Sequence, residues 1–261
     1  MSNNEEYNYC IPTTWIGKDG VMNKGLWYFY HLRMKERIKN YQNAWSHIVA
    51  NKKNLSNYPR IEEHYVSISE QYCYVLFNLD QIIKIERKQY PDNDDVFFMT
   101  YFTYNFILST KSVLDIFAWL IYDIFACNCE PFEVSLFFKN YHKAKEKHKE
   151  FKKQLCAKSG LKFYKYICSD KVQTVLAILE QHRDIVCHKG KIHIMVHENK
   201  DVDQSTIMKP VEPYISIDKN FATLRYEKCS VFSETTLLTL DSIFDHVNNL
   251  YKEECTRLLK S

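Results

Sequence analysis

The chain has 261 residues, of which 46% are hydrophobic, and it contains only 5 Gly and 6 Pro. This composition supports a substantial core, excludes a linker-rich chain and favours helix. The formal net charge of +3 is too close to neutral to identify a nucleic-acid binder by itself. Any such function must therefore depend on local patches of charge.

The first half of the chain shows mainly helical periodicity. The first 25 residues are polar and irregular, and apolar residues at three-to-four spacing then predict a helix over residues 26–50. Residues 51–60 are expected to form a loop that is closed by Pro59, and the helical pattern returns over residues 66–89.

The most apolar part of the chain follows a Pro-Asp-Asn-Asp break at residues 91–94 and predicts a central helix over residues 95–127. Its densest run, residues 112–126, holds Asp115 and Asp123 and is too short for a membrane span. We expect this run to be a buried core helix without membrane contact.

Three further segments are predicted to be helical. Pro131 suits a first helical turn and predicts a helix over residues 131–154. After a turn at residues 157–160, Asp170 is expected to cap a helix over residues 171–187, with Gly190 placed where a C-terminal glycine belongs. An amphipathic helix over residues 233–259 completes the chain.

Between the last two predicted helices the hydrophobic period changes from helical to two. Ile192, Ile194 and Val196 alternate with polar residues, and residues 218–220 form a hairpin signal between two further strand-like runs. The predicted fold is mainly α: one domain over residues 1–261, a helical bundle with a small antiparallel β-hairpin or sheet at residues 191–228, inserted before the C-terminal helix.

Nine irregularly spaced cysteines without a CxxC pair, and a polar N-terminus without an apolar signal region, favour a cytoplasmic protein with reduced thiols. Cys127 and Cys129 flank one residue and are expected to be buried or loop thiols. The neighbouring Cys187, His188, His193 and His197 suit zinc chemically. Because paired ligand spacing is missing, we predict neither a metal site nor a cofactor.

Arg183 and His188 lie five positions apart at the end of a predicted helix, with Asp184 directly after the arginine. A permanently charged guanidinium beside an imidazole is minimal equipment for metal-free cleavage of an RNA phosphodiester. On an ideal helix the pair would point ~140° apart. If Gly190 ends the helix, His188 can depart from ideal geometry in the last turn, where the helix dipole favours its protonated form.

The Ser109-Thr110-Lys111-Ser112-Val113-Leu114-Asp115 stretch on the central helix, followed by Arg183 to Gly190 on a later one, resembles the HEPN superfamily. Its members are helical bundles marked by an Arg, four to six residues, and a His, with a polar residue commonly after the Arg. The resemblance covers about residues 66–188. The chain departs from one toxin variety, since no Tyr stands two residues after His188.

The resemblance implies a metal-independent endoribonuclease that forms a homodimer and pairs two motifs in one cleft. Arg183 would hold the scissile phosphate, His188 would act as general acid or base, and Asp184 would orient one of them. The RNA 2′-hydroxyl would attack and leave a 2′,3′-cyclic phosphate. A role in defence or stress response, and an antitoxin or regulatory protein as partner, follow from the analogy alone.

Two interpretations of the motif stay open. Many proteins that resemble this superfamily are non-catalytic dimerisation or interaction modules, in which Arg183 and His188 would form a terminal salt bridge with Asp184 or cap the helix. Lys111 and Asp115 have the i,i+4 spacing of a helix-stabilising pair, although Asp115 could instead reach Arg183.

Four lysines are candidate RNA-binding residues. The run from residue 139 to 153 predicts a basic helix with interleaved aromatics that could follow an RNA backbone or form a solvated face. The candidates are Lys143 and Lys147 in this run, Lys111 on the central helix, and Lys189 directly after His188.

Overall fold

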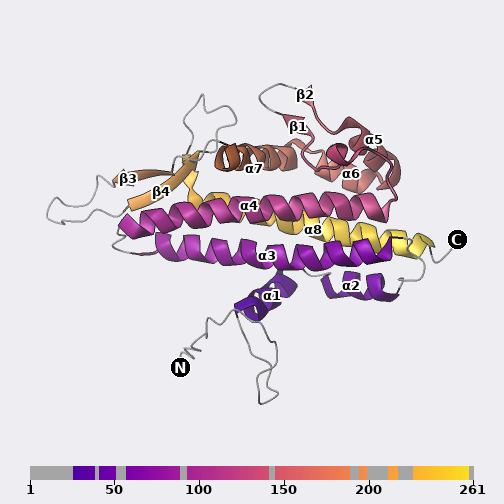
Figure 1. Ribbon diagram of the computed structural model, residues 1–261, viewed down its shortest axis with the longest axis horizontal. Coiled ribbons are helices and arrows are strands. Elements are labelled where there is room, and N and C mark those ends of the chain that lie inside the picture. Colours follow the sequence, from indigo (N-terminus) through magenta and orange to yellow (C-terminus); the bar gives the residue numbers. More distant parts are fainter. Residues whose placement is uncertain are drawn as a thin grey trace, which may run out of the picture.

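The computed structural model describes residues 26–38, 41–50, 57–88, 93–140, 145–188, 194–198, 211–216 and 226–258, and the protein is mainly α-helical over them. Three long helices lie side by side: α3 (Tyr58–Glu86), α4 (Asn93–Ile124) and α8 (Cys229–Leu258) (Figure 1). Helices α4 and α8 run in one direction and α3 in the opposite one. No helix in the described part of the chain combines the length and apolarity of a membrane span.

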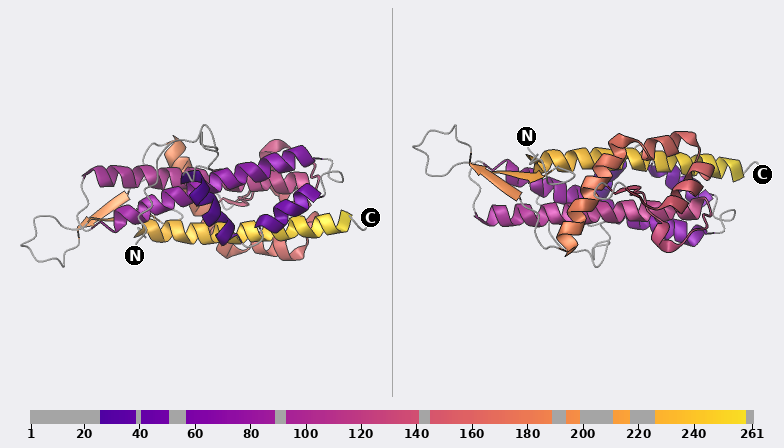
Figure 2. Two further views of the ribbon diagram at one scale, coloured as in Figure 1. Left: turned by 90° about the horizontal axis from the view of Figure 1, so that it is seen from below. Right: turned by 90° about the horizontal axis from the view of Figure 1, so that it is seen from above.

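Shorter helices cover the long ones on two sides. Helices α1 (Leu26–Arg37) and α2 (Tyr41–Ala50) pack on one side, against α3 and α8. Helix α7 (Asp170–His188) lies on the other side and crosses over α4 and α8 at a steep angle (Figure 2, right). The small helices α5 (Lys149–Lys158) and α6 (Leu161–Ile167) lead into α7.

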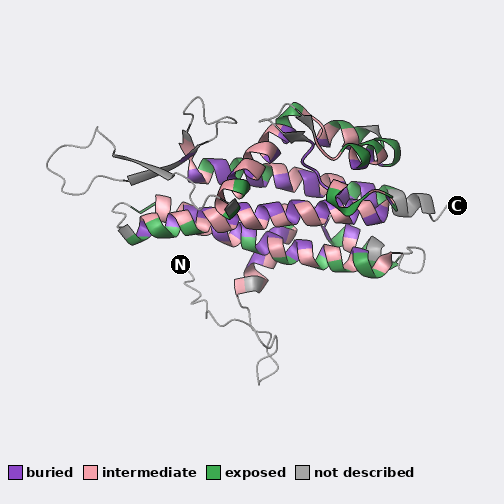
Figure 3. Ribbon diagram, turned by 45° about the horizontal axis from the view of Figure 1, so that its top comes forward, coloured by how far each residue is buried: buried purple, intermediate pink, exposed green. Residues whose placement is uncertain are grey.

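The core is built largely from aromatic rings between the long helices. The Phe244 ring on α8 lies 4.9 Å from that of Phe117 and about 6 Å from those of Tyr41, Tyr65 and Tyr72. The edge-to-face orientation of most of these pairs is the favourable one for aromatic rings. Figure 3 shows the buried residues following the inner faces of the long helices, with exposed residues on the outside.

The predicted helices over residues 95–127, 171–187 and 233–259 are confirmed with small shifts of their ends, by α4, α7 and α8. The expected loop at residues 51–60 is wrong for its last residues, because α3 already begins at Tyr58. Pro59 occupies the first turn of α3, where a missing N–H costs no hydrogen bond.

The predicted helix over residues 26–50 is interrupted. Helix α1 ends at Arg37, and the N–H of Tyr41 donates to the carbonyl of Ile38 at 3.0 Å as α2 begins. Ile38 and Tyr41, on either side of the break, are both buried, and α1 packs on α3 while α2 packs mainly on α8.

The predicted helix over residues 131–154, with its basic run, is also wrong. Only a 3-10 turn, η1 (Pro131–Glu133), forms at its start, and α5 forms at its end. All five residues from Val134 to Phe138 are buried. A helix on the surface of a bundle cannot bury five consecutive residues, because they point around its whole circumference. The segment is therefore not helical, and the structure gives it no regular secondary structure.

Short strands complete the described part. β1 (Lys139–Asn140) pairs with β2 (Lys145–Glu146), while β3 (Ile194–Glu198), β4 (Val211–Ser216) and β5 (Tyr226–Lys228) pair antiparallel in that order. In the register, Ile194 faces Ile215 and Ser216 faces Tyr226. The predicted hairpin turn at residues 218–220, Ile192 and the N-terminal 25 residues lie outside the described residues.

Candidate functional site

Helix α7, which carries the Arg/His motif, is anchored by one buried face. Its buried apolar side chains are Val172, Leu176 and Leu179, and His182 continues the same stripe at 2% exposure. The His182 ring lies edge-to-face against Phe232 of α8, with centroids 5.6 Å apart. Because His182 fills the interface with α8, the adjacent Arg183 is turned toward the edge of the contact and not into the core.

Arg183 is paired with its neighbour on the surface. Its Nη1 lies 3.0 Å from Oδ1 of Asp184, and the two side chains are 29% and 53% exposed. An ion pair this exposed is weak, because water screens the charges and both side chains lose rotamer freedom. Asp115 does not hold Arg183, since it pairs with Lys111 one turn away on α4. The guanidinium is therefore not locked inside the bundle.

His188 is the last residue of α7, so the motif ends where the helix ends. The backbone at the C-terminus of a helix presents carbonyls without intrahelical partners, which favours a cation there. The side chain of His188, together with Lys189 and Gly190, lies outside the described residues. The structure therefore describes the helix that carries the motif and the side-chain contacts of Arg183 and Asp184.

The candidate RNA-binding lysines have different surroundings. Lys111 is buried, pairs with Asp115, and its ammonium lies 4.2 Å from the centroid of the Phe137 ring. This arrangement is the stabilising i,i+4 pair with an added cation–π contact. Lys147 is half-buried and lies 3.2 Å from a carboxylate oxygen of Glu180 on α7. Lys143 lies outside the described residues.

The thiols and imidazoles form no metal centre in the part of the chain that the structure describes, since no three potential ligands cluster there. Cys127 is buried, and burial raises the pKa of its thiol to about 11. A thiol with such a pKa is protonated near neutrality and is a poor nucleophile or ligand. Cys127 therefore behaves as a core residue; His193 lies outside the described residues.

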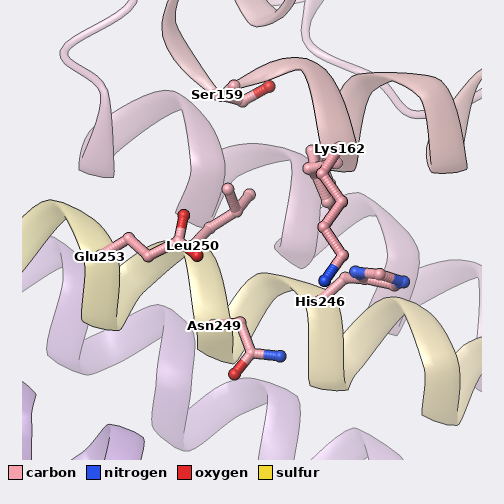
Figure 4. Close-up of a pocket in the computed structure, with 8 residues that line it drawn as sticks. Ser159, Lys162, His246, Asn249, Leu250 and Glu253 are labelled. Carbon is pink, nitrogen blue, oxygen red and sulfur yellow. The ribbon is translucent and has the colours of Figure 1, made fainter.

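A hollow of about 370 Å³ lies away from the motif, between the α5–α6 turn and the C-terminal part of α8. Figure 4 shows the ammonium of Lys162 beside the imidazole of His246, with Asn249 and Glu253 further along α8. Burial, and then the charge of Lys162, lower the pKa of His246. Its ring also lies 4.0 Å from that of Tyr166, so the imidazole is packed against an aromatic side chain.

The structure also assembles an Arg/His pair that periodicity and spacing did not single out. Arg60 and His64 are one turn apart on α3, and both approach the buried carboxylate of Asp123 at the end of α4. Their i,i+4 spacing and the acidic residue inside an apolar run were the available signals. The sequence did not reveal that α3 and α4 place these three residues together.

No known protein family matches the sequence, and neither a curated protein nor a solved structure matches it significantly. The resemblance to the HEPN superfamily accordingly stays a prediction.

Proposed function

We propose that this protein is a HEPN-like, metal-independent endoribonuclease with Arg183 and His188 as its catalytic pair. The proposal rests on the surroundings of Arg183. This residue lies in the last turns of α7, which ends at His188, and its ion pair with Asp184 lies at the surface, where water screens it. The non-catalytic alternative also allows a terminal salt bridge between Arg183 and Asp184, so variants at both motif residues are needed to separate the two functions.

The chemistry follows from the two side-chain types. A base, assigned to His188, takes the proton of an RNA 2′-hydroxyl, whose oxygen attacks the adjacent phosphorus. The bond from phosphorus to the 5′-oxygen breaks, and that oxygen receives a proton from an imidazolium. The products are a 2′,3′-cyclic phosphate and a 5′-hydroxyl. Arg183 supplies planar donors for the phosphoryl oxygens as their charge develops.

One protomer offers a single His188, whereas the reaction needs both a base and an acid. A two-fold dimer would bring His188 of the partner subunit to the same cleft, so that one imidazole accepts and the other donates the proton. Asp184, exposed beside Arg183, would orient the guanidinium. An RNA substrate, a homodimer and a regulatory protein partner in a cytoplasmic defence or stress system belong to this proposal.

The test is cleavage of a mixed pool of single-stranded and structured RNA in excess EDTA. The wild-type protein should release 2′,3′-cyclic phosphate ends, and His188→Ala and Arg183→Ala should abolish them. Arg183→Lys keeps the charge but loses the planar fork, so it should also be impaired. Lys171→Ala, at an exposed position in the first turn of the same helix, is the matched control and should cleave normally.

The competing function, a non-catalytic dimerisation or interaction module, is favoured by a different observation. Phe97, Phe98 and Tyr101 are exposed near the start of α4. The rings of Phe97 and Phe98 lie 5.6 Å apart, so the exposed aromatic surface is continuous. Apolar patches on a protein surface often mark contacts with another protein. An intact dimer without cleavage, whose self-association is lost in Phe97→Ser, would favour this module over the nuclease.

A further inference from the structure

A buried carboxylate holds an arginine and a histidine at the end of the bundle where α3 begins and α4 ends (Figure 1). Nε2 of His64 lies 3.0 Å, and Nε of Arg60 lies 3.3 Å, from the same oxygen, Oδ2 of Asp123. The Asp123 side chain is fully buried, whereas those of His64 and Arg60 are 20% and 52% exposed. The negative charge thus lies inside and the donors face outward.

The chain fixes this carboxylate with a rigid end to α4. Ala126 adopts a left-handed conformation (φ 44°), and the N–H of Cys127 donates to the carbonyl of Tyr122 at 2.9 Å. The ammonium of Lys158 donates to the carbonyls of Phe125 and Ala126 at 3.1 and 2.9 Å. These contacts satisfy carbonyls that a helix end leaves open, so Asp123 stands on an ordered turn.

Arg60 and His64 each contact Asp123 through one nitrogen, so this carboxylate does not use their other nitrogens. Arg60 uses Nε, and its two terminal nitrogens make no ion pair with any residue that the structure describes. His64 uses Nε2 as donor to the carboxylate, which leaves Nδ1 as the second ring nitrogen. A carboxylate that accepts from one ring nitrogen fixes the orientation of the imidazole.

The backbone around this pair also favours an anion. Arg60 stands in the first turn of α3, a helix whose N-terminus has no side-chain cap and no acidic residue in its first turn. The N-terminal end of a long helix carries partial positive charge. Glu62 and Glu63, which lie between Arg60 and His64 in the chain, are opposing charges on this part of α3.

We propose that Arg60 and His64, positioned by Asp123, form a binding site for a phosphate group. The terminal guanidinium nitrogens would donate to two phosphate oxygens and Nδ1 of His64 to a third, the geometry in which arginine is most selective for phosphate. The site stands apart from Arg183 and does not depend on the proposed nuclease. Its phosphate can belong to a small organic phosphate or to a nucleic-acid strand, and binding experiments separate the two.

A purely structural role accounts less well for these residues. Burying a carboxylate carries a desolvation cost that an ion pair recovers only with good geometry on both sides. Here the arginine is half-exposed, and Oδ1 of Asp123 is buried without a hydrogen-bond partner in the described part of the chain. An apolar residue at position 123 would occupy the end of α4 without the desolvation cost of a buried carboxylate. The carboxylate makes sense where it holds the guanidinium and the imidazole in place for a ligand.

The experiment follows the ring resonances of the histidines in the full chain by NMR. The protein is titrated separately with inorganic phosphate, adenosine 5′-monophosphate and a single-stranded oligodeoxynucleotide, which lacks the 2′-hydroxyl and cannot be cleaved. His64 should shift with at least one probe. Arg60→Gln and His64→Gln should weaken binding of that probe at least about tenfold. Arg87→Gln removes the same charge at the opposite, exposed end of α3 and should bind like wild type.

The outcomes separate the possibilities. Tighter binding of the monophosphate than of the oligonucleotide identifies a small-molecule site, and the reverse order identifies a nucleic-acid contact. An unshifted His64 with all three probes, or unchanged affinity in Arg60→Gln, overturns the proposal. Because Arg60 is half-exposed, its variant should fold even if Asp123→Asn does not. Arg183→Ala should retain binding, so failure of the nuclease and failure of this site are distinguishable.

Discussion

The side-chain oxygen of Gln173 accepts a hydrogen bond from the backbone N–H of Phe138 at 3.0 Å, inside the protein. The amide nitrogen of Gln173 donates to the carbonyls of Leu136 and Ile167 at 3.0 and 2.8 Å. One buried side chain on α7 therefore satisfies three backbone groups, two of them on the irregular segment before β1. This is how an irregular stretch of five buried residues avoids unpaired polar groups.

Gln173→Met should lower the free energy of unfolding by about 3 kcal/mol, although it changes the side-chain volume little. The substitution leaves one N–H and two carbonyls buried without partners, and each carries a desolvation penalty of roughly 1–3 kcal/mol. Urea denaturation measures the difference. Gln42→Met, at an exposed position on α2, should change stability by less than about 0.5 kcal/mol. Equal effects of the two variants would contradict the role given to Gln173.

The same contact explains where sequence-based prediction failed. The long helices α4, α7 and α8 are predictable because each shows one apolar stripe at helical spacing. The run Val134 to Phe138 has no such stripe, and Pro131 made a helix start plausible. Its irregular backbone is stabilised by Gln173, which lies 35 positions after Phe138. Periodicity within a window does not contain that information.

The candidate sites also differ in how far the sequence alone could predict them. Arg183 and Asp184 are neighbours in the chain, so their placement near the end of a helix was predictable. Asp123 and His64 are separated by 59 positions, and only the packing of α3 against α4 brings them together. An acidic residue in an apolar run was visible in the sequence. Which cationic residue it would meet was not.

Phe244→Ala should be among the most destabilising single substitutions in the chain. Phe244 is fully buried and its ring touches rings from α2, α3 and α4, so the truncation leaves a cavity shared by four helices. The expected loss is about 3–5 kcal/mol. Phe132→Ala removes the same group from a position that is 74% exposed and should cost less than about 0.5 kcal/mol. Chemical denaturation of both variants checks the contrast.

Acid should destabilise the fold through partly buried imidazoles. Burial, and then the charge of Lys35, lower the pKa of His31 to about 4, and burial also lowers the pKa values of His148 and His246. The unfolded chain binds a proton at its ordinary pKa of about 6.5. Between these values the unfolded state holds more protons, so the free energy of unfolding decreases as the pH falls from about 6.5 toward 4.

His31→Phe isolates the largest of these contributions. It keeps a ring against Tyr41, whose centroid lies 5.9 Å from that of His31, and removes the titrating group. After allowance for solvent screening, the wild type should lose about 1 kcal/mol more than the variant between about pH 7 and pH 5. Urea denaturation at the two pH values measures this difference. Parallel losses in both proteins would show that His31 does not cause the acid sensitivity.

Asp184→Asn separates catalysis from stability at the proposed nuclease site. The pair with Arg183 is exposed, so its loss should change the free energy of unfolding by less than about 0.5 kcal/mol. If the carboxylate orients the guanidinium toward the phosphate, the rate of RNA cleavage should nevertheless fall about tenfold. A less well positioned guanidinium slows the reaction but does not change the stability of the fold. Cleavage rates and denaturation curves of the same preparation check both statements. Unchanged cleavage in Asp184→Asn would mean that Arg183 needs no orienting partner.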